Sequence, residues 1–263
     1  MYDFTYHRPG NLAEAARLAK GAEAKLMAGG MTLIPTLKQR LAHPSDVIDL
    51  GGLKDLVGIK VEGGRVVIGA LTPHAQVAGS ADVQKAIPAL AHLADGIGDP
   101  QVRNRGTIGG SLANNDPAAD YPAAALGLGA TIQTNERAIP ADEYFKGMFE
   151  TALKEGEIIT SVSFPIPEKA GYAKFPNPAS RYAVIGVFVS KGPQGVRVAV
   201  TGAGNGVFRV KAMEDALSRS WSADSLKGLA VPADQCNGDI HASSEYRAHL
   251  IGVMAKRAVQ AAG

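Results

Sequence analysis

Two patterns of apolar residues alternate along the first fifty residues: helical spacing and short continuous runs. Apolar residues follow Asn11 at helical spacing, namely Leu12, Ala15, Ala16 and Ala19. Short apolar runs at 24–30 and 45–50 predict two buried strands, and Thr32 is placed to cap a helix between them that ends at about residue 41. Two strands joined by a helix are usually parallel. The pattern therefore predicts a small βαβ-like unit over residues 1–53.

The next stretch, 54–167, alternates strands with helices. A strand is expected over 63–73 after a Gly-Gly turn, and a helical pattern over 74–96 is interrupted at Pro88. A polar, glycine-rich loop then extends to Asp116, which is positioned as the cap of a helix running from Pro117 to Leu128. Strand patterns follow within 129–145 and 156–167. This stretch predicts a larger mixed α/β unit.

The last stretch, 168–263, predicts a sheet with helices packed on it. Residues 168–180 are expected to form a loop. Apolar runs at 181–191 and 195–204 flank the Gly192-Pro193 turn and predict a hairpin, while 208–219 and 245–261 have helical spacing. The whole chain is therefore expected to be α+β, in three parts.

Composition excludes several classes of protein. The 263 residues are 46% hydrophobic and 20% charged, as in ordinary soluble globular proteins, and the net charge of +2 comes from scattered basic residues, which argues against nucleic acid as a partner. Cys236 is the only cysteine, so this chain alone can build neither a disulfide nor an iron–sulfur cluster. No apolar run approaches the about 20 residues of a transmembrane helix, and the N-terminus lacks a signal pattern. We expect a cytoplasmic protein without a transmembrane segment.

Two glycine-centred segments carry the candidate chemistry: LMAGGMTL (26–33) and TIGGSLANN (107–115), the second preceded by Arg103-Asn104-Arg105. Glycine lets another object approach the backbone closely, and successive N–H groups in such a turn can surround an anion. Neither segment matches the dinucleotide fingerprint or the P-loop. Each alone could be a plain turn. Two such segments in one chain favour one pyrophosphate that spans both.

No catalytic side-chain constellation is visible. The six histidines show neither an H-E-x-x-H motif nor paired spacing with acids, and G-x-S-x-G is absent. Asp116 is interpreted as a helix cap, while Asp120 could either bind a ligand hydroxyl or compensate the helix dipole. Tyr182, which opens an apolar strand, is by default a core or edge residue. These features favour a protein whose chemistry belongs to a bound cofactor.

The motifs resemble the flavin-binding subunit of the molybdenum hydroxylases, the family of aerobic carbon monoxide dehydrogenase and xanthine dehydrogenase. The resemblance lies in YDFTYHRPGNLAEAARL, LMAGGMTLIP, RNRGTIGGSLANNDPAAD and KFPNPASRYAVIGVFV, and it covers essentially the whole chain. It implies a two-part FAD-binding domain of the PCMH type over 1–167, with sub-lobes 1–53 and 54–167. A small α+β C-terminal domain over 168–263, of the carbon monoxide dehydrogenase flavoprotein type, would follow.

The resemblance also implies the residues that bind FAD. Backbone N–H groups of two segments would approach the pyrophosphate, Asp120 would bind the ribityl or adenosine portion, Ile97 and Ile159 would contact the cofactor, and Tyr182 would cover the isoalloxazine ring. The two segments are Leu26, Met27, Ala28, Gly29, Gly30, Met31, Thr32 and Leu33, and Thr107, Ile108, Gly109, Gly110 and Ser111. Met31 stands where the family often has histidine or asparagine. No metal site is expected in this chain.

The implied function is electron transfer within a larger complex. Electrons would come from two-iron two-sulfur clusters on a small subunit, fed by a molybdopterin cofactor on a large subunit, and would leave to a quinone, NAD or dioxygen. A dimer of heterotrimers is the implied assembly. A non-redox module that binds a nucleotide or phosphate ligand is the alternative, and a stand-alone flavin oxidase is a third possibility without a visible substrate base. All of these require the segments 26–33 and 107–111 to meet at one cleft.

Overall fold

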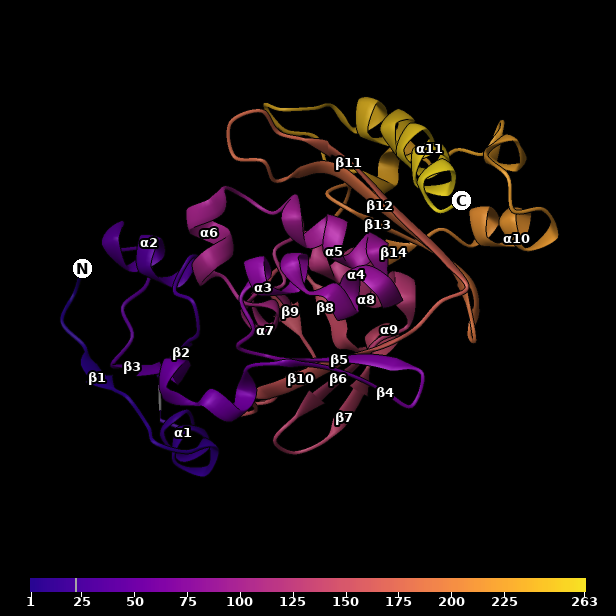
Figure 1. Ribbon diagram of the computed structural model, residues 1–263. Helices are drawn as coiled ribbons and strands as arrows, with labels where there is room; N and C mark the ends of the chain where they lie inside the picture. The colour runs from indigo at the N-terminus through magenta and orange to yellow at the C-terminus, as the bar shows by residue number, and fades with distance from the viewer. Residues whose placement is uncertain (22) are drawn as a thin grey trace.

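Three main β-sheets follow one another along the chain, each formed by a separate stretch (Figure 1). The computed structural model describes residues 1–21 and 23–263. Within these residues, no helix combines the length and the apolar character needed to cross a bilayer. The predicted α+β class with a small βαβ-like unit is confirmed.

The first sheet is parallel and has the order β1-β3-β2. Its core is formed by Ala15, Ile48 and Leu50, which are buried against the larger part of the molecule through Leu71 and Ile158. Asn11 caps the first helix, because its side chain accepts a hydrogen bond from the Glu14 N–H. The elements are β1 (Thr5–His7), α1 (Leu12–Leu18), β2 (Lys25–Met27), α2 (Leu33–Lys38), β3 (Asp46–Asp49) and the 3₁₀ turns η1 (Leu50–Gly52) and η2 (Lys54–Leu56).

The second sheet is antiparallel, with the order β4-β5-β10-β6-β7, and a group of short helices packs on it. Its strands are β4 (Ile59–Glu62), β5 (Arg65–Gly69), β6 (Thr131–Thr134), β7 (Ala138–Pro140) and β10 (Ile159–Pro165), and β8 (Phe145–Gly147) pairs separately with β9 (Glu150–Thr151). The helices are α3 (His74–Gly79), α4 (Ala81–Ala86), α5 (Pro88–Asp95), α6 (Pro100–Arg105), α7 (Ile108–Asn114), α8 (Tyr121–Leu128) and α9 (Ala141–Tyr144).

The third sheet is antiparallel, with the order β11-β12-β13-β14. Helix α11 packs on one face of this sheet, and α5 and α8 contact the other side, so that the C-terminal sheet lies over the helical layer of the second unit (Figure 1). The elements are β11 (Lys169–Pro176), β12 (Ala183–Gly192), β13 (Gly195–Thr201), β14 (Phe208–Arg209), α10 (Lys211–Arg219), η3 (Ala223–Leu226), η4 (Ala233–Gln235) and α11 (Ser244–Ala261).

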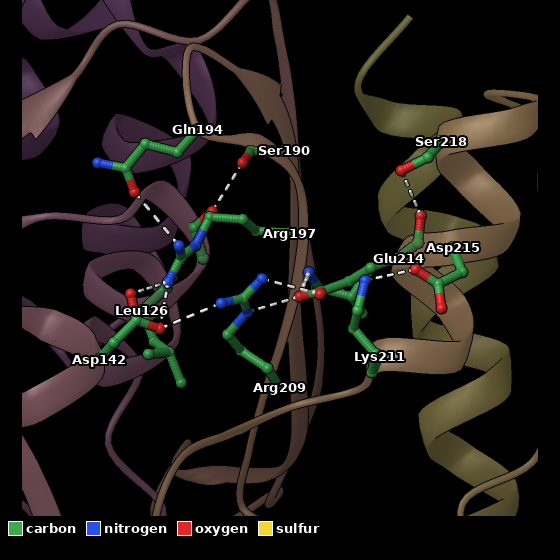
Figure 2. Close-up of polar contacts among 12 residues, drawn as sticks. Leu126, Asp142, Ser190, Gln194, Arg197, Arg209, Lys211, Glu214, Asp215 and Ser218 are labelled. Atoms are coloured by element: carbon green, nitrogen blue, oxygen red, sulfur yellow. Dashed lines mark hydrogen bonds and ion pairs between the residues drawn. The ribbon is translucent and has the colours of Figure 1, made fainter.

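Helix α8 is buried all round and joins the second unit to the third sheet. Gly127 permits the contact, because a Cβ there would lie 2.9 Å from the Phe188 ring. The carbonyls of the last helical turn have no partner inside the helix. Arg197 Nε donates to the Leu126 carbonyl at 2.8 Å and Ser190 Oγ donates to the Gly127 carbonyl at 2.6 Å, so side chains of the third sheet cap α8 (Figure 2).

Two sequence-based expectations about the middle of the chain are wrong. The predicted glycine-rich loop contains helices α6 and α7, each started by a side-chain cap: Asp99 accepts from Val102 N–H, and Thr107 accepts from Gly110 N–H. Glycine lowers helix propensity, which hid α7 in the pattern. Asp116 does not cap the next helix; its carboxylate closes a turn with Ala118 N–H at 2.8 Å, and α8 starts four residues later than predicted, at Tyr121.

The segment 168–180 is also more regular than predicted, because strand β11 occupies most of it. Its glycine and prolines resemble loop residues in the sequence. Gly171 is instead required by packing, since a Cβ there would lie 1.9 Å from the Ala258 carbonyl oxygen of α11. Strand β11 pairs with β12 along its whole length, which no local pattern could indicate.

Candidate functional site

The two glycine-centred segments are in direct contact. A Cβ at Gly29 would lie 1.9 Å from the carbonyl oxygen of Arg105, so only glycine allows this approach. On the other side of the contact, a Cβ at Gly110 would lie 3.6 Å from the Ala28 side chain. The loop after β2 therefore rests on the α6–α7 connection, as the sequence-based hypothesis requires.

A cavity of about 640 Å³ opens where the two segments meet. All the residues predicted to bind the cofactor line it except Ile108, namely Leu26, Met27, Ala28, Gly29, Gly30, Met31, Thr32, Leu33, Ile97, Thr107, Gly109, Gly110, Ser111, Asp120, Ile159 and Tyr182. Ile108 is fully buried in the core of the second unit, and its N–H donates to the Thr72 carbonyl at 3.3 Å. The cavity thus brings together residues from all three parts of the chain.

The first segment offers backbone donors to this cavity. Within the described residues, the N–H groups of 28–33 donate to no acceptor of the protein, whereas Ile34 N–H already bonds the Gly30 carbonyl at 2.9 Å. Gly30 has φ +74°, a backbone conformation that side-chain-bearing residues rarely adopt. These unpaired donors at the start of α2 suit an anionic ligand.

The second segment differs from the expectation, because its successive N–H groups are already used. Gly109 N–H donates to the Ala70 carbonyl at 2.8 Å, Gly110 N–H to Thr107 Oγ1 at 3.1 Å, and Ser111 N–H to the Thr107 carbonyl at 3.0 Å. The helical conformation of α7 explains the bonds of Gly110 and Ser111, and the packing of α7 on Ala70 explains that of Gly109. Gly109 is needed for a different reason, since a Cβ there would lie 2.6 Å from Ala70 Cβ. The segment supplies a thin wall rather than a row of free donors.

Asp120 is a buried carboxylate on the cavity wall, 4% exposed. It precedes α8 and makes no capping bond; instead it accepts from the Tyr172 hydroxyl and pairs with Lys174, whose Nζ lies 2.9 Å from Oδ1. Burial raises the pKa of Asp120, while Lys174 and Tyr172 act in the opposite direction. Dipole compensation alone therefore does not account for this residue.

Tyr182 lies at the edge of the cavity, in the loop that joins β11 to β12, and is 45% exposed. The Asn177 N–H donates to the Tyr182 carbonyl at 2.8 Å, which closes this loop. Arg181, with φ +63°, reaches across and donates to the Gly98 carbonyl at 3.3 Å. The loop consequently holds an aromatic side chain at the cavity that Ile97 and Gly98 also line.

Sequence reasoning missed several residues that line the cavity, of which His74 is the most informative. His74 is 5% exposed, and its Nδ1 has no hydrogen-bond partner within the described residues. Burial and the nearby Arg103 charge lower the pKa of His74 to about 4, so the imidazole is neutral near pH 7. No motif marks His74 in the sequence, and only its position after strand β5 could have indicated it. Other missed lining residues include Leu50, Leu71, Val102, Leu153, Glu157 and Ile158.

The arrangement suits binding rather than side-chain catalysis. No group of three or more potential metal-ligating His, Cys, Asp or Glu side chains occurs within residues 1–21 and 23–263. The cavity combines unpaired backbone donors, walls thinned by glycine, apolar side chains and two buried carboxylates, Asp120 and Glu157. Such a site fits a ligand with a diphosphate, hydroxyl groups and a flat apolar part.

Comparisons with known proteins agree with this geometry. Residues 2–167 match the family model of the FAD binding domain in molybdopterin dehydrogenase. The carbon monoxide dehydrogenase medium chain of Hydrogenophaga pseudoflava is 34% identical, over 98% of this chain and 96% of the relative. The nicotine 6-hydroxylase medium subunit of Paenarthrobacter nicotinovorans is 35% identical over the same shares.

A solved structure of reconstituted carbon monoxide dehydrogenase from Oligotropha carboxidovorans superposes with a TM-score of 0.90 at 32% identity, over 99% of this chain and 98% of that one. The similarity therefore extends over the C-terminal sheet as well as the matched family model. The chain belongs to the family of FAD-binding subunits of the molybdenum hydroxylases, which are FAD-dependent oxidoreductase subunits of multi-subunit enzymes.

Proposed function

We propose that the cavity between the two glycine-centred segments is the FAD site and that the chain transfers electrons through it. The observation that carries the proposal is the contact of Gly29 with Arg105, which places the unpaired N–H groups of 28–33 against the thin wall of α7. A diphosphate between these surfaces would accept hydrogen bonds from the N–H groups that have no acceptor within the protein. The cavity volume of about 640 Å³ lies within the range of cofactor sites.

The residues present fit the cofactor. Segment 28–33 would hold the diphosphate, Asp120 would accept a hydrogen bond from a hydroxyl, and Ile97 and Ile159 would contact apolar surface. Tyr182, at the edge of the cavity, would cover the ring system and limit the access of water. His74 would provide a neutral polar atom without adding charge. Bound FAD supplies the redox chemistry, because it accepts and releases electrons.

The electron partners are proposed from composition and relatives. A single cysteine excludes iron–sulfur clusters within this chain, so the donor clusters would belong to a small subunit and the molybdopterin cofactor to a large one. The relatives are medium chains or subunits by name. We propose a dimer of heterotrimers in the cytoplasm, with a quinone, NAD or dioxygen as acceptor.

We also propose the division into an FAD-binding domain, 1–167 with lobes 1–53 and 54–167, and a C-terminal domain, 168–263.

The test is reconstitution of the full chain with FAD. Retained flavin should show its visible absorption band, lose it with dithionite, and recover it with one of the three acceptors. Adding ADP should compete with FAD, because both would use segment 28–33. A chain that binds adenine nucleotides tightly but never retains flavin would contradict the proposal and support a non-redox nucleotide-binding module.

A further inference from the structure

Strand β11 reaches the cavity wall only indirectly, through Asp120. The Tyr172 hydroxyl donates to Asp120 Oδ1, and Lys174 Nζ lies 2.9 Å from Oδ1 and 3.1 Å from Oδ2. Tyr172 is 4% exposed and the Lys174 side chain is 10% exposed. Within the described residues, neither belongs to the residues that line the cavity. They contact the carboxylate without lining the cavity themselves.

The third sheet makes room for this contact. In the β11–β12 register, Lys174 faces Gly186 and Tyr172 faces Phe188. A Cβ at Gly186 would lie 2.5 Å from the Tyr172 hydroxyl oxygen, so glycine leaves the space that the hydroxyl occupies. Lys174 is fixed at a second point, because Nζ also donates to the Gly96 carbonyl at 2.8 Å. The donors are thus held by the sheet and by the end of α5.

We propose that Tyr172 and Lys174 are positioning residues for the cofactor site, holding Asp120 as a fixed hydrogen-bond acceptor that selects a ligand with a hydroxyl-bearing chain. The inference rests on the proposed function, because it deepens the role of Asp120 in the same cavity. A carboxylate with two protein donors keeps lone pairs for one more donor. A ligand hydroxyl can supply that donor, whereas a carbonyl or a second anion cannot.

The electrostatic surroundings of Asp120 agree with this role. Burial and the Asp120 charge raise the pKa of Tyr172 well above its usual value, so its hydroxyl remains a donor. Burial also raises the pKa of Tyr121, and burial with Asp116 and Asp120 raises that of Tyr182, so neither tyrosine ionises near neutral pH. Lys174 is the cation that opposes the effect of burial on Asp120.

The test compares FAD dissociation constants of the full chain and its variants between about pH 6 and pH 9. Tyr172→Phe keeps the ring but removes one donor that favours the charged carboxylate, so Asp120 should hold a proton at higher pH. We expect about tenfold weaker FAD binding at the acidic end, with recovery toward the unmodified chain as pH rises. Lys174→Met should show the same trend with a larger loss.

The matched control is Tyr144→Phe. Tyr144 is also fully buried, but its hydroxyl donates to the Leu112 carbonyl at 3.1 Å, away from Asp120. A purely structural role for Tyr172 would make both tyrosine variants alike, with any loss of affinity independent of pH. That result, or unchanged FAD affinity in both Tyr172→Phe and Lys174→Met, would overturn the inference.

The Asp120→Asn variant separates the positioning role from other causes. Its amide cannot titrate, so Tyr172→Phe should cause no further pH-dependent change in that background. An undiminished effect would also contradict the inference. Failure of the unmodified chain to bind FAD at any pH would instead reject the proposed function itself.

Discussion

The Nη2 atom of Arg197 lies 2.6 Å and 2.7 Å from the two carboxylate oxygens of Asp142, and this pair connects strand β13 to helix α9 (Figure 2). Arg209 extends the connection, because it contacts Asp142 at 3.2 Å and Glu214 of α10 at 2.7 Å. Burial alone would raise the pKa of Asp142, but hydrogen bonds and charges of Arg197 and Arg209 hold its pKa below the usual range. The network fixes the third sheet on the second unit, and with it strand β11, which bears Tyr172, and the β11–β12 loop, which bears Tyr182.

Arg197→Met should therefore destabilise the whole chain. The side chain is 5% exposed, and its loss removes the side-chain donor of the Leu126 carbonyl, which keeps the Gly129 N–H at 3.3 Å, and leaves Asp142 with one cation fewer. Because Asp142 is partly exposed and keeps Arg209, we expect a loss of about 2 kcal/mol in the free energy of unfolding. Urea unfolding followed by circular dichroism measures this quantity.

Lys211→Met is the control for the loss of a cation. Lys211 pairs with Asp215 in the same region, but both side chains are mostly exposed (Figure 2). Such a pair contributes less than about 1 kcal/mol. Equal losses in the two variants would show that Arg197 contributes no more than a surface charge.

Gly29→Ala should reduce FAD retention more than it reduces stability. The added Cβ would overlap the Arg105 carbonyl, and since the donors of 28–33 lie beside this contact, the two walls of the cavity must separate. We expect at least a tenfold rise in the FAD dissociation constant. Gly79→Ala is the control, because no atom of the described residues lies within 4 Å of a Cβ at that position of helix α3. Full flavin occupancy in Gly29→Ala would contradict the placement of the site.

Gly109→Ala should behave differently from Gly29→Ala. Its Cβ would meet the side chain and backbone of Ala70, which belongs to the core of the second unit and cannot move freely. We expect lower stability, by about 2 kcal/mol, together with loss of flavin. Thermal unfolding of the flavin-free protein distinguishes this variant from Gly29→Ala. An unchanged midpoint would show that Ala70 can shift without a loss of stability.

The residues of the candidate site were easier to predict from the sequence than the backbone conformation of the segments that carry them. Gly29 and Gly109 could be recognised because a close approach of two backbone segments permits only glycine, so the constraint is visible at single positions of the sequence. The unpaired donors of 28–33 and the paired ones of 109–111 could not be distinguished, since the difference depends on whether α7 forms. Strand β11 was hidden because its pairing with β12 and its contact with α11 involve residues distant in sequence. For the same reason, Tyr172 and Lys174 carried no local signal.

His74 should make the stability of the flavin-free protein depend on pH. Its folded pKa of about 4 lies below the value of 6.5 of a free histidine, so the unfolded chain binds more protons between these values. Stability should therefore fall as pH drops through 6.5, and the cost should be complete below about pH 4.

His74→Leu tests this assignment because it removes the titrating group and leaves no unpaired Nδ1 in the buried position. Between pH 7 and pH 5, the unmodified protein should lose about 2 kcal/mol more free energy of unfolding than the variant. Urea titrations at the two pH values measure the difference, and His249→Leu, on helix α11, serves as the control for loss of a histidine elsewhere. Equal pH dependence in the unmodified protein and His74→Leu would mean that His74 becomes protonated in the folded state as easily as in the unfolded one, and that the cavity wall is wetter than its burial indicates.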